Sequence, residues 1–191
     1  MMKRLVAPLA LLAMLATPVL AQEKPKADKM KMEKEKMEVD HMGDPASDMA
    51  PLIGQYGGWL VKGAEQMPAA DYTWKPTPAV RSFGELVGHV ANSNFAICAG
   101  IKGDKTMRKP DYEKVSDKAA LVTAVKESMA YCQTVHEWGK AHHHDMVDLF
   151  GMKGSVSWGL AFNIAHNAEH YGNMVTYMRM KGMVPPSSQS N

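Results

Sequence analysis

Four segments of about 20 residues that each have the pattern of a helix constrain the fold more than any other feature of the sequence. The clearest start is an S-x-x-E capping box made by Ser82 and Glu85, in which each side chain satisfies a free backbone N–H of the first helical turn. This helix is expected to reach about Ile101 and to end at Gly103, because glycine is the usual residue after a helix. The other three helices are expected at 47–67, 117–142 and 155–180.

No stretch of the sequence alternates apolar and polar residues as a half-buried strand does. Four helices joined by polar connections therefore predict an all-α fold, with a four-helix bundle as the architecture. Residues 49–188 are the expected domain, since their number is typical of one domain.

The two cysteines constrain how the middle helices run. Cys98 and Cys132 lie 16 and 15 residues past the expected starts of the second and third helices, so they reach the same height if these helices are parallel. An antiparallel pair would offset them by roughly 9 Å, beyond the roughly 7 Å that a disulfide spans between Cα atoms. Residues 102–116 are a connection long enough for a parallel crossover. We predict a Cys98–Cys132 disulfide in an up-down-down-up bundle, with two buried free thiols as the alternative.

Residues 1–21 have the layout of a secretory signal peptide. Lys3 and Arg4 form a basic start, an apolar run follows, and small residues precede an expected cleavage after Ala21. The apolar run is too short to span a membrane as a helix. We therefore expect an exported protein, either periplasmic or secreted, in a compartment where disulfides persist.

Cleavage of the expected signal peptide would change the net charge of the chain. The chain has 22 basic and 20 acidic residues, and removal of Lys3 and Arg4 leaves 20 of each. A neutral chain argues against nucleic acid or an anionic membrane as the main partner. We expect a small molecule as the ligand, no nucleic acid and no membrane span, and we leave a homodimer open.

Residues 22–48 differ in composition from the rest of the chain. They contain six lysines, eight acidic residues and no aromatic residue, which is too little apolar surface to offset the entropy of ordering. We interpret them as a disordered tether. Because soft thioethers suit copper(I), a second interpretation is a copper site formed by His41 and nearby methionines. These methionines are Met30, Met32, Met37 and Met42.

The strongest chemical signal is a histidine pair in the last helix. His166 and His170 are four residues apart, so their imidazoles lie on one helix face and can share one divalent cation. Two ligands hold a metal weakly, and His89, on the expected core side of the helix at 82–101, is the third candidate. Three histidines with open coordination positions are typical of a reactive metal site. A solvent-facing stripe of ordinary histidines is the alternative.

Further polar residues surround this pair. Asn163 and Asn173 continue the stripe of His166 and His170, so both are expected to support the metal ligands, since polar groups that face a core need partners. Glu169 lies about 100° around the helix from His170, where it can hold an imidazole of a neighbouring turn or act as a base. No catalytic residue is assigned.

The remaining histidines are weaker candidates for metal ligands. We expect His136 to be a hydrogen-bonded histidine of the third helix, either in the core or at its rim. His142, His143 and His144 are consecutive and point in different directions from a helix, so they cannot all bind one ion.

The sequence around the three candidate ligands reads FGELVGHVANSN and, later, HNAEHYGNMVTYMRMKGMVPPSS. These segments resemble the DinB-like proteins, whose relatives include bacillithiol S-transferases and mycothiol-dependent maleylpyruvate isomerases. The resemblance covers most of residues 50–188. It implies an up-down-down-up four-helix bundle and a site for zinc, nickel, iron or manganese, with His89, His166 and His170 as the ligands.

Three functions fit these observations. The first is a metal-dependent hydrolase or thiol/group transferase for a small molecule, since a cation held by neutral imidazoles keeps its charge and its open positions. The second is a non-catalytic metal- or ligand-binding module. The third is a structural bundle that binds metal only adventitiously. The metal itself stays unassigned, because three histidines accept several first-row ions.

Overall fold

The computed structural model describes residues 30–31, 45–107 and 109–189. The chain divides into two units, Met1–Met42 and Gly43–Asn191. The predicted signal peptide and His41 lie outside the described residues, as does most of the predicted tether. In the described part of the chain, no helix is long and apolar enough to cross a membrane.

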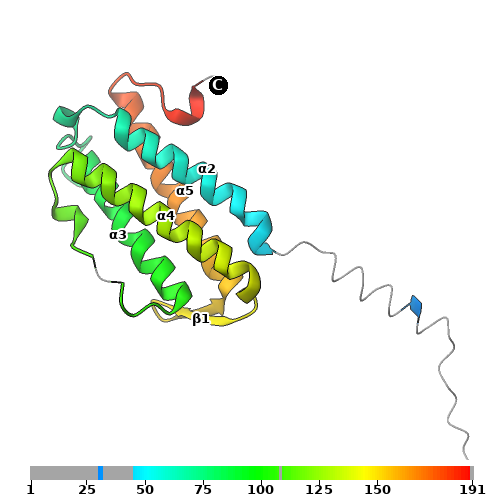
Figure 1. Ribbon diagram of the computed structural model, residues 1–191. Coiled ribbons are helices and arrows are strands. Elements are labelled where there is room, and N and C mark those ends of the chain that lie inside the picture. Colours follow the sequence, from blue (N-terminus) through cyan, green and yellow to red (C-terminus); the bar gives the residue numbers. More distant parts are fainter. Residues whose placement is uncertain (1–29, 32–44, 108, 190–191) are drawn as a thin grey trace, which may run out of the picture. The chain divides into compact units, whose positions relative to one another are not determined.

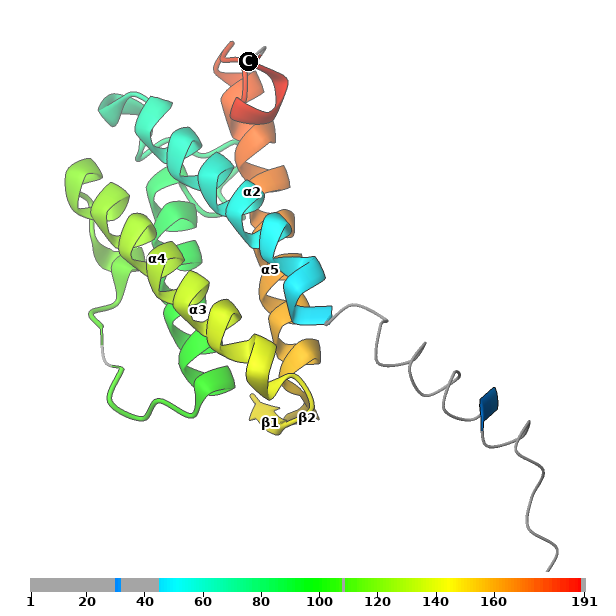
Figure 2. The ribbon, with the colours of Figure 1, turned by 45° about the vertical axis from the view of Figure 1, so that its right-hand side comes forward.

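Four long helices form the bundle of the second unit (Figure 1). They are α2 (Pro45–Gln66), α3 (Phe83–Lys102), α4 (Lys118–His142) and α5 (Val156–Met180). α2 and α3 each pack against both α4 and α5 (Figure 2). The predicted all-α fold class is confirmed. α2 begins at Pro45, so the last residues of the segment predicted as a tether are helical.

The helices run up-down-down-up, as predicted. α4 begins beside the end of α2, where Lys118 Nζ donates a hydrogen bond to the Met67 carbonyl at 2.7 Å, so these two helices are antiparallel. α3 and α4 both begin at that same end, and a Cβ on Gly84 would lie 3.4 Å from Leu121 Cδ1. The connection between α3 and α4 is therefore the long crossover that a parallel pair requires.

Local capping fixes the ends of the helices as the sequence predicts. Ser82 Oγ accepts a hydrogen bond from Glu85 N, and Glu85 Oε2 accepts one from Ser82 N, which completes the capping box of α3. α3 ends at Gly103, whose φ of 70° is the left-handed conformation that glycine adopts without strain. Asp117 and Ser155 cap the first turns of α4 and α5.

The structure joins the two cysteines in a disulfide, within the apolar core that packs α3 against α4. The Cα atoms of Cys98 and Cys132 are 5.5 Å apart, within the range of a normal bridge. Both residues are fully buried. The parallel direction of α3 and α4 is what brings them to the same height.

A short hairpin between α4 and α5 was not predicted. Its strands are β1 (Met146–Leu149) and β2 (Met152–Ser155), which pair antiparallel with Leu149 opposite Met152. The two joining residues, Phe150 and Gly151, have φ of 57° and 84°. Positive φ at both central residues is the requirement of a type I′ turn. The sequence lacks the Asn-Gly pair that marks such turns, which explains why the hairpin escaped prediction.

Candidate metal centre

Three imidazoles from two antiparallel helices meet at one point of the bundle. His89 comes from α3, and His166 and His170 come from α5. One ring nitrogen of each lies within 4.8 Å of the other two, and the Nε2 atoms of His166 and His170 are 3.1 Å apart. Two nitrogens bound to one first-row ion at about 2.1 Å lie about 3.0 Å apart at octahedral angles and about 3.4 Å apart at tetrahedral angles. This pair therefore already has the spacing of two ligands of one ion.

Gly88, which precedes His89 on α3, leaves room for a further segment of the chain to approach the cluster. The short 3-10 helix η2 (Tyr112–Lys114) lies against α3, and a Cβ on Gly88 would overlap the Tyr112 carbonyl oxygen. Asn92 of α3 holds this turn in place, since its amide donates to Asp111 Oδ1 at 2.8 Å and accepts from Tyr112 N at 3.0 Å.

This turn carries Glu113, which contacts His89. Glu113 Oε1 is 2.8 Å from His89 Nδ1, and Oε2 accepts a hydrogen bond from Arg81 Nε at 2.8 Å. A carboxylate that accepts the Nδ1 proton leaves the Nε2 lone pair of a histidine free for a metal. Burial raises the pKa of Glu113, but the hydrogen bonds and charges of Arg81 and His89 outweigh it and hold this pKa below its usual value.

The environment of the cluster keeps imidazoles neutral. Burial lowers the pKa of His166 to about 4, and His170 and His89 act in the same direction. Burial is also the main cause that lowers the pKa of His170, with His89 as the next cause. Neutral imidazole is the form that binds a metal ion, so at neutral pH these two side chains need no deprotonation before binding.

Of the residues predicted to support the ligands, two lie near the cluster. Asn173 Nδ2 is 3.5 Å from His170 Nδ1. Glu169 is exposed, and its charge raises the pKa of His170 against the effect of burial. Neither Glu113 nor Arg81 was anticipated, because both reach the cluster through the fold of segments outside the long helices.

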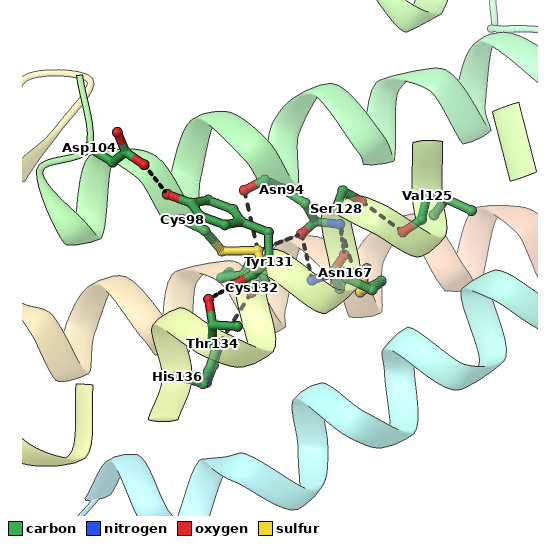
Figure 3. The surroundings of a disulfide bond; sticks show 12 residues. Asn94, Cys98, Asp104, Val125, Ser128, Tyr131, Cys132, Thr134, His136 and Asn167 are labelled. Carbon is green, nitrogen blue, oxygen red and sulfur yellow. Dashed lines mark hydrogen bonds between the residues drawn. A yellow bond between two sulfur atoms is a disulfide. The ribbon is translucent and has the colours of Figure 1, made fainter. Parts of the chain in front are cut away.

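Asn163 has other partners, contrary to expectation. Its Nδ2 donates to Asn94 Oδ1 at 2.8 Å, and its Oδ1 is 3.3 Å from His136 Nε2. Asn94 also exchanges hydrogen bonds with Asn167, at 3.1 and 3.0 Å. We call Asn94, Asn163, Asn167 and His136 the amide network; it lies beside the disulfide (Figure 3). The network confirms His136 as a hydrogen-bonded core residue.

The three consecutive histidines at the end of α4 do not form a shared site. His142 stacks on Trp138 and has Nδ1 2.9 Å from Asp145 Oδ2. His143 Nδ1 lies 2.9 Å from the Lys140 carbonyl oxygen. Within the described residues, His89, His166 and His170 are the one group of three histidine, cysteine or acidic side chains close enough for a single ion.

Two cavities border the three-histidine cluster. One has a volume of about 600 Å³, and its lining includes Arg81, Glu113, His170 and Tyr177. The other has a volume of about 280 Å³ and borders His89 and His166. A ligand can therefore approach the cluster from either cavity.

Comparison with known proteins agrees with this architecture. A DinB-like protein from Bacillus cereus ATCC 10987 is similar in structure, with a TM-score of 0.60 and 16% sequence identity over 69% of this chain and 89% of that one. A DinB-like protein from Bacillus subtilis has a TM-score of 0.58 and 20% identity over 75% of this chain and 99% of that one. No curated protein matches the sequence.

The sequence also matches the family model of the DinB superfamily. The match covers residues 60–174, which is more than half of the chain and includes all three clustered histidines. The chain therefore belongs to the DinB superfamily.

Proposed function

We propose that His89, His166 and His170 bind one divalent transition-metal ion, and that this ion is the reactive centre of an enzyme that acts on a small molecule. The observation that carries the proposal is the convergence of three ring nitrogens within 4.8 Å of one another. Imidazole ligands suit zinc, nickel and iron, whereas manganese prefers oxygen ligands, so the donor set fits the first three of the metals that the resemblance implies better than the fourth.

The surrounding residues give the ligands the support that a metal site needs. Glu113 fixes the ring orientation of His89 through Nδ1, and Arg81 in turn holds Glu113. Such carboxylate–histidine pairs orient a ligand and raise its basicity. Three protein ligands leave coordination positions open. A bound ion would supply a Lewis acid that polarises a substrate group and lowers the pKa of a water or thiol ligand.

The larger cavity supports the binding of a polar substrate beside the cluster. Arg81 and Tyr177 line it together with His170. The Arg81 guanidinium bonds Glu113 through Nε, and its side chain remains 43% exposed. Its other N–H groups therefore favour an anionic group on the substrate. Hydrolysis or thiol/group transfer is the chemistry that we assign to the site.

A non-catalytic binding module is the second candidate, and one observation favours it. Both carboxylates that line the larger cavity are already engaged. Glu85 belongs to the capping box of α3, and Glu113 bonds Arg81 and His89. Neither carboxylate is free to act as a general base, so a metal-bound module without turnover remains the alternative.

We also propose that the protein works outside the cytosol. The Cys98–Cys132 disulfide is compatible with an oxidising compartment, and residues 1–21 have the layout of an export signal. The periplasm or the extracellular medium is the expected location.

Metal analysis of protein never exposed to a nickel resin tests the metal centre. We expect about one equivalent of a first-row metal per chain, and less than about a tenth in His89→Ala and His166→Ala. His144→Ala is the matched control and should keep the native metal content. Native protein with less than about a tenth of an equivalent, or with a content unchanged by both variants, would contradict the proposal.

Turnover then separates the enzyme from the binding module. The metal-loaded protein is assayed with ester, amide and thiol-transfer substrates. Turnover that disappears in His166→Ala supports the enzyme. A metal-loaded protein that turns over none of these substrates supports the non-catalytic module.

A further inference from the structure

The smaller cavity beside the cluster has an apolar wall that the proposed metal chemistry does not use. Ala96 and Ile97 of α3 and Phe162 of α5 contribute to it, and Phe150 joins them from the turn of the β1–β2 hairpin. His89 and His166 also line this cavity, so the apolar wall is continuous with the candidate metal centre.

Phe150 has a backbone conformation that is unfavourable for a residue with its side chain. Its φ of 57° is left-handed, which residues with a bulky side chain rarely adopt. Asparagine followed by glycine is the preferred pair for such a turn. The Phe150 side chain is 68% exposed, so burial in the core does not compensate for the strained backbone. Strained residues of this kind occur preferentially at ligand sites.

The hairpin is anchored, so the ring of Phe150 has a defined place. Leu149 is 1% exposed, and it packs so closely on α3 that a Cβ on Gly100 would lie 2.6 Å from its Cδ2 atom. On the second strand, a Cβ on Gly154 would lie 2.5 Å from the Trp158 ring of α5. The Gly151 N–H donates to Asp148 Oδ1 at 2.8 Å and closes the turn.

We propose that the hairpin, α3 and α5 form a subsite for an aromatic or other apolar arm of the molecule whose polar group binds at the histidine cluster. This inference rests on the proposed metal centre. A volume of about 280 Å³ lies just below the range of whole ligand sites. It therefore suits one ring-sized group of a ligand that is anchored at His89 and His166.

Two hydroxamic acids that chelate metals test the subsite. Acetohydroxamic acid carries a methyl group, and 3-phenylpropanohydroxamic acid carries a phenyl arm on the same chelating head. Dissociation constants for both are measured by calorimetry on the zinc-loaded native protein. We expect the phenyl compound to bind roughly tenfold more tightly, because its ring leaves water for an apolar wall.

The variant Phe150→Asn removes the ring and keeps the turn, since Asn-Gly is the preferred pair there. We expect the preference for the phenyl compound to fall several-fold, and the affinity for acetohydroxamic acid to stay the same. Ala96→Glu is a second variant, at an exposed helix position, and should weaken phenyl binding in the same way. Met146→Gln changes an exposed hairpin residue that does not line the cavity. This control variant should therefore prefer the phenyl compound as strongly as the native protein does.

The failures of the two proposals are distinguishable. If acetohydroxamic acid does not bind the zinc-treated native protein, the metal centre is overturned and the subsite with it. If both compounds bind but Phe150→Asn and Ala96→Glu keep the native preference, the subsite alone is overturned and the metal centre stands.

Discussion

Two groups of polar side chains connect α3 to α5, and their polar atoms are satisfied in different ways. In the amide network, Asn94, Asn163 and Asn167 are 0% exposed and bond one another. In the histidine cluster, His166 and His170 bring two ring nitrogens together at 3.1 Å beside cavities that a ligand can enter. Buried amides that bond one another stabilise a fold, whereas converging nitrogens next to open space are suited to binding.

This difference leads to separable effects of mutation. Changes in or beside the amide network should lower the free energy of unfolding and leave the metal affinity of the folded protein intact. Changes around the histidine cluster should lower metal affinity and have little effect on the stability of the metal-free protein.

The largest expected loss of stability comes from the disulfide, which lies beside the amide network (Figure 3). Cys98 and Cys132 are 34 residues apart, and a loop of that length restricts the unfolded chain by about 4 kcal/mol. We expect a loss of that order in the Cys98→Ala, Cys132→Ala double variant, measured by urea unfolding. Zinc affinity, measured by competition with a chelator, should not change. An equal loss of zinc affinity would contradict the separation of the two regions.

The next largest effect is expected for Asn94→Ala. This variant removes the partner of two buried amides, those of Asn163 and Asn167, at a cost of about 3 kcal/mol. Urea unfolding measures it, with Gln133→Ala at an exposed position of α4 as the control. The separation would be refuted if Asn94→Ala were as stable as the control.

Substitution of Glu113 tests the prediction for the histidine cluster. Glu113→Ala removes the acceptor for His89 Nδ1, and we expect zinc affinity to fall by about 10- to 100-fold with little change in stability. Glu113→Gln keeps an acceptor oxygen and should lose less. Glu127 pairs with Lys109 at an exposed position, so Glu127→Ala is the matched control. Equal affinities of Glu113→Ala and Glu127→Ala would show that Glu113 has no part in the site.

The smallest effect is a pH dependence of stability that comes from the amide network. Burial lowers the pKa of His136, and the hydrogen bond to Asn163 opposes this only in part. The unfolded chain takes up a proton near pH 6.5, while the folded protein takes up the same proton only at a lower pH. Stability is therefore complete above about pH 6.5 and is lost as the pH falls, by at most about 1.4 kcal/mol per pH unit for this one proton.

The variant His136→Gln isolates this contribution from that of the other histidines. Unfolding free energies of the metal-free native protein and of the variant are compared between pH 7.5 and 5.5. The native protein should lose more stability than the variant as the pH falls. Parallel curves would show that His136 does not titrate differently in the folded and unfolded chains.

The parts of the fold that could be predicted are those with local causes. Ser82, Glu85 and Gly103 act within one turn of the helix ends that they define. The spacing of Cys98 and Cys132 predicts the direction of two helices once these residues are taken to be paired, as they are in the structure. The geometry of His166 and His170 follows in the same way from the pitch of a helix.

The parts that escaped prediction depend on contacts between distant segments. Glu113 reaches His89 only because Gly88 leaves room for the turn that carries it. Asn163 lies on the same helix stripe as His166. The Asn163 amide nevertheless belongs to the network, because Asn94 on a neighbouring helix accepts its hydrogen bond. The Phe150 turn lacks the residues that normally mark such a turn. The signal peptide and the copper interpretation of the methionines stay predictions.

The most direct test of the metal centre is a crystal structure of the zinc-loaded protein with anomalous diffraction at the zinc edge. We expect one strong anomalous peak, bound by one nitrogen each of His89, His166 and His170 at about 2.1 Å. A zinc ion bound instead at the consecutive histidines that begin at His142, with none at the cluster, would contradict the account.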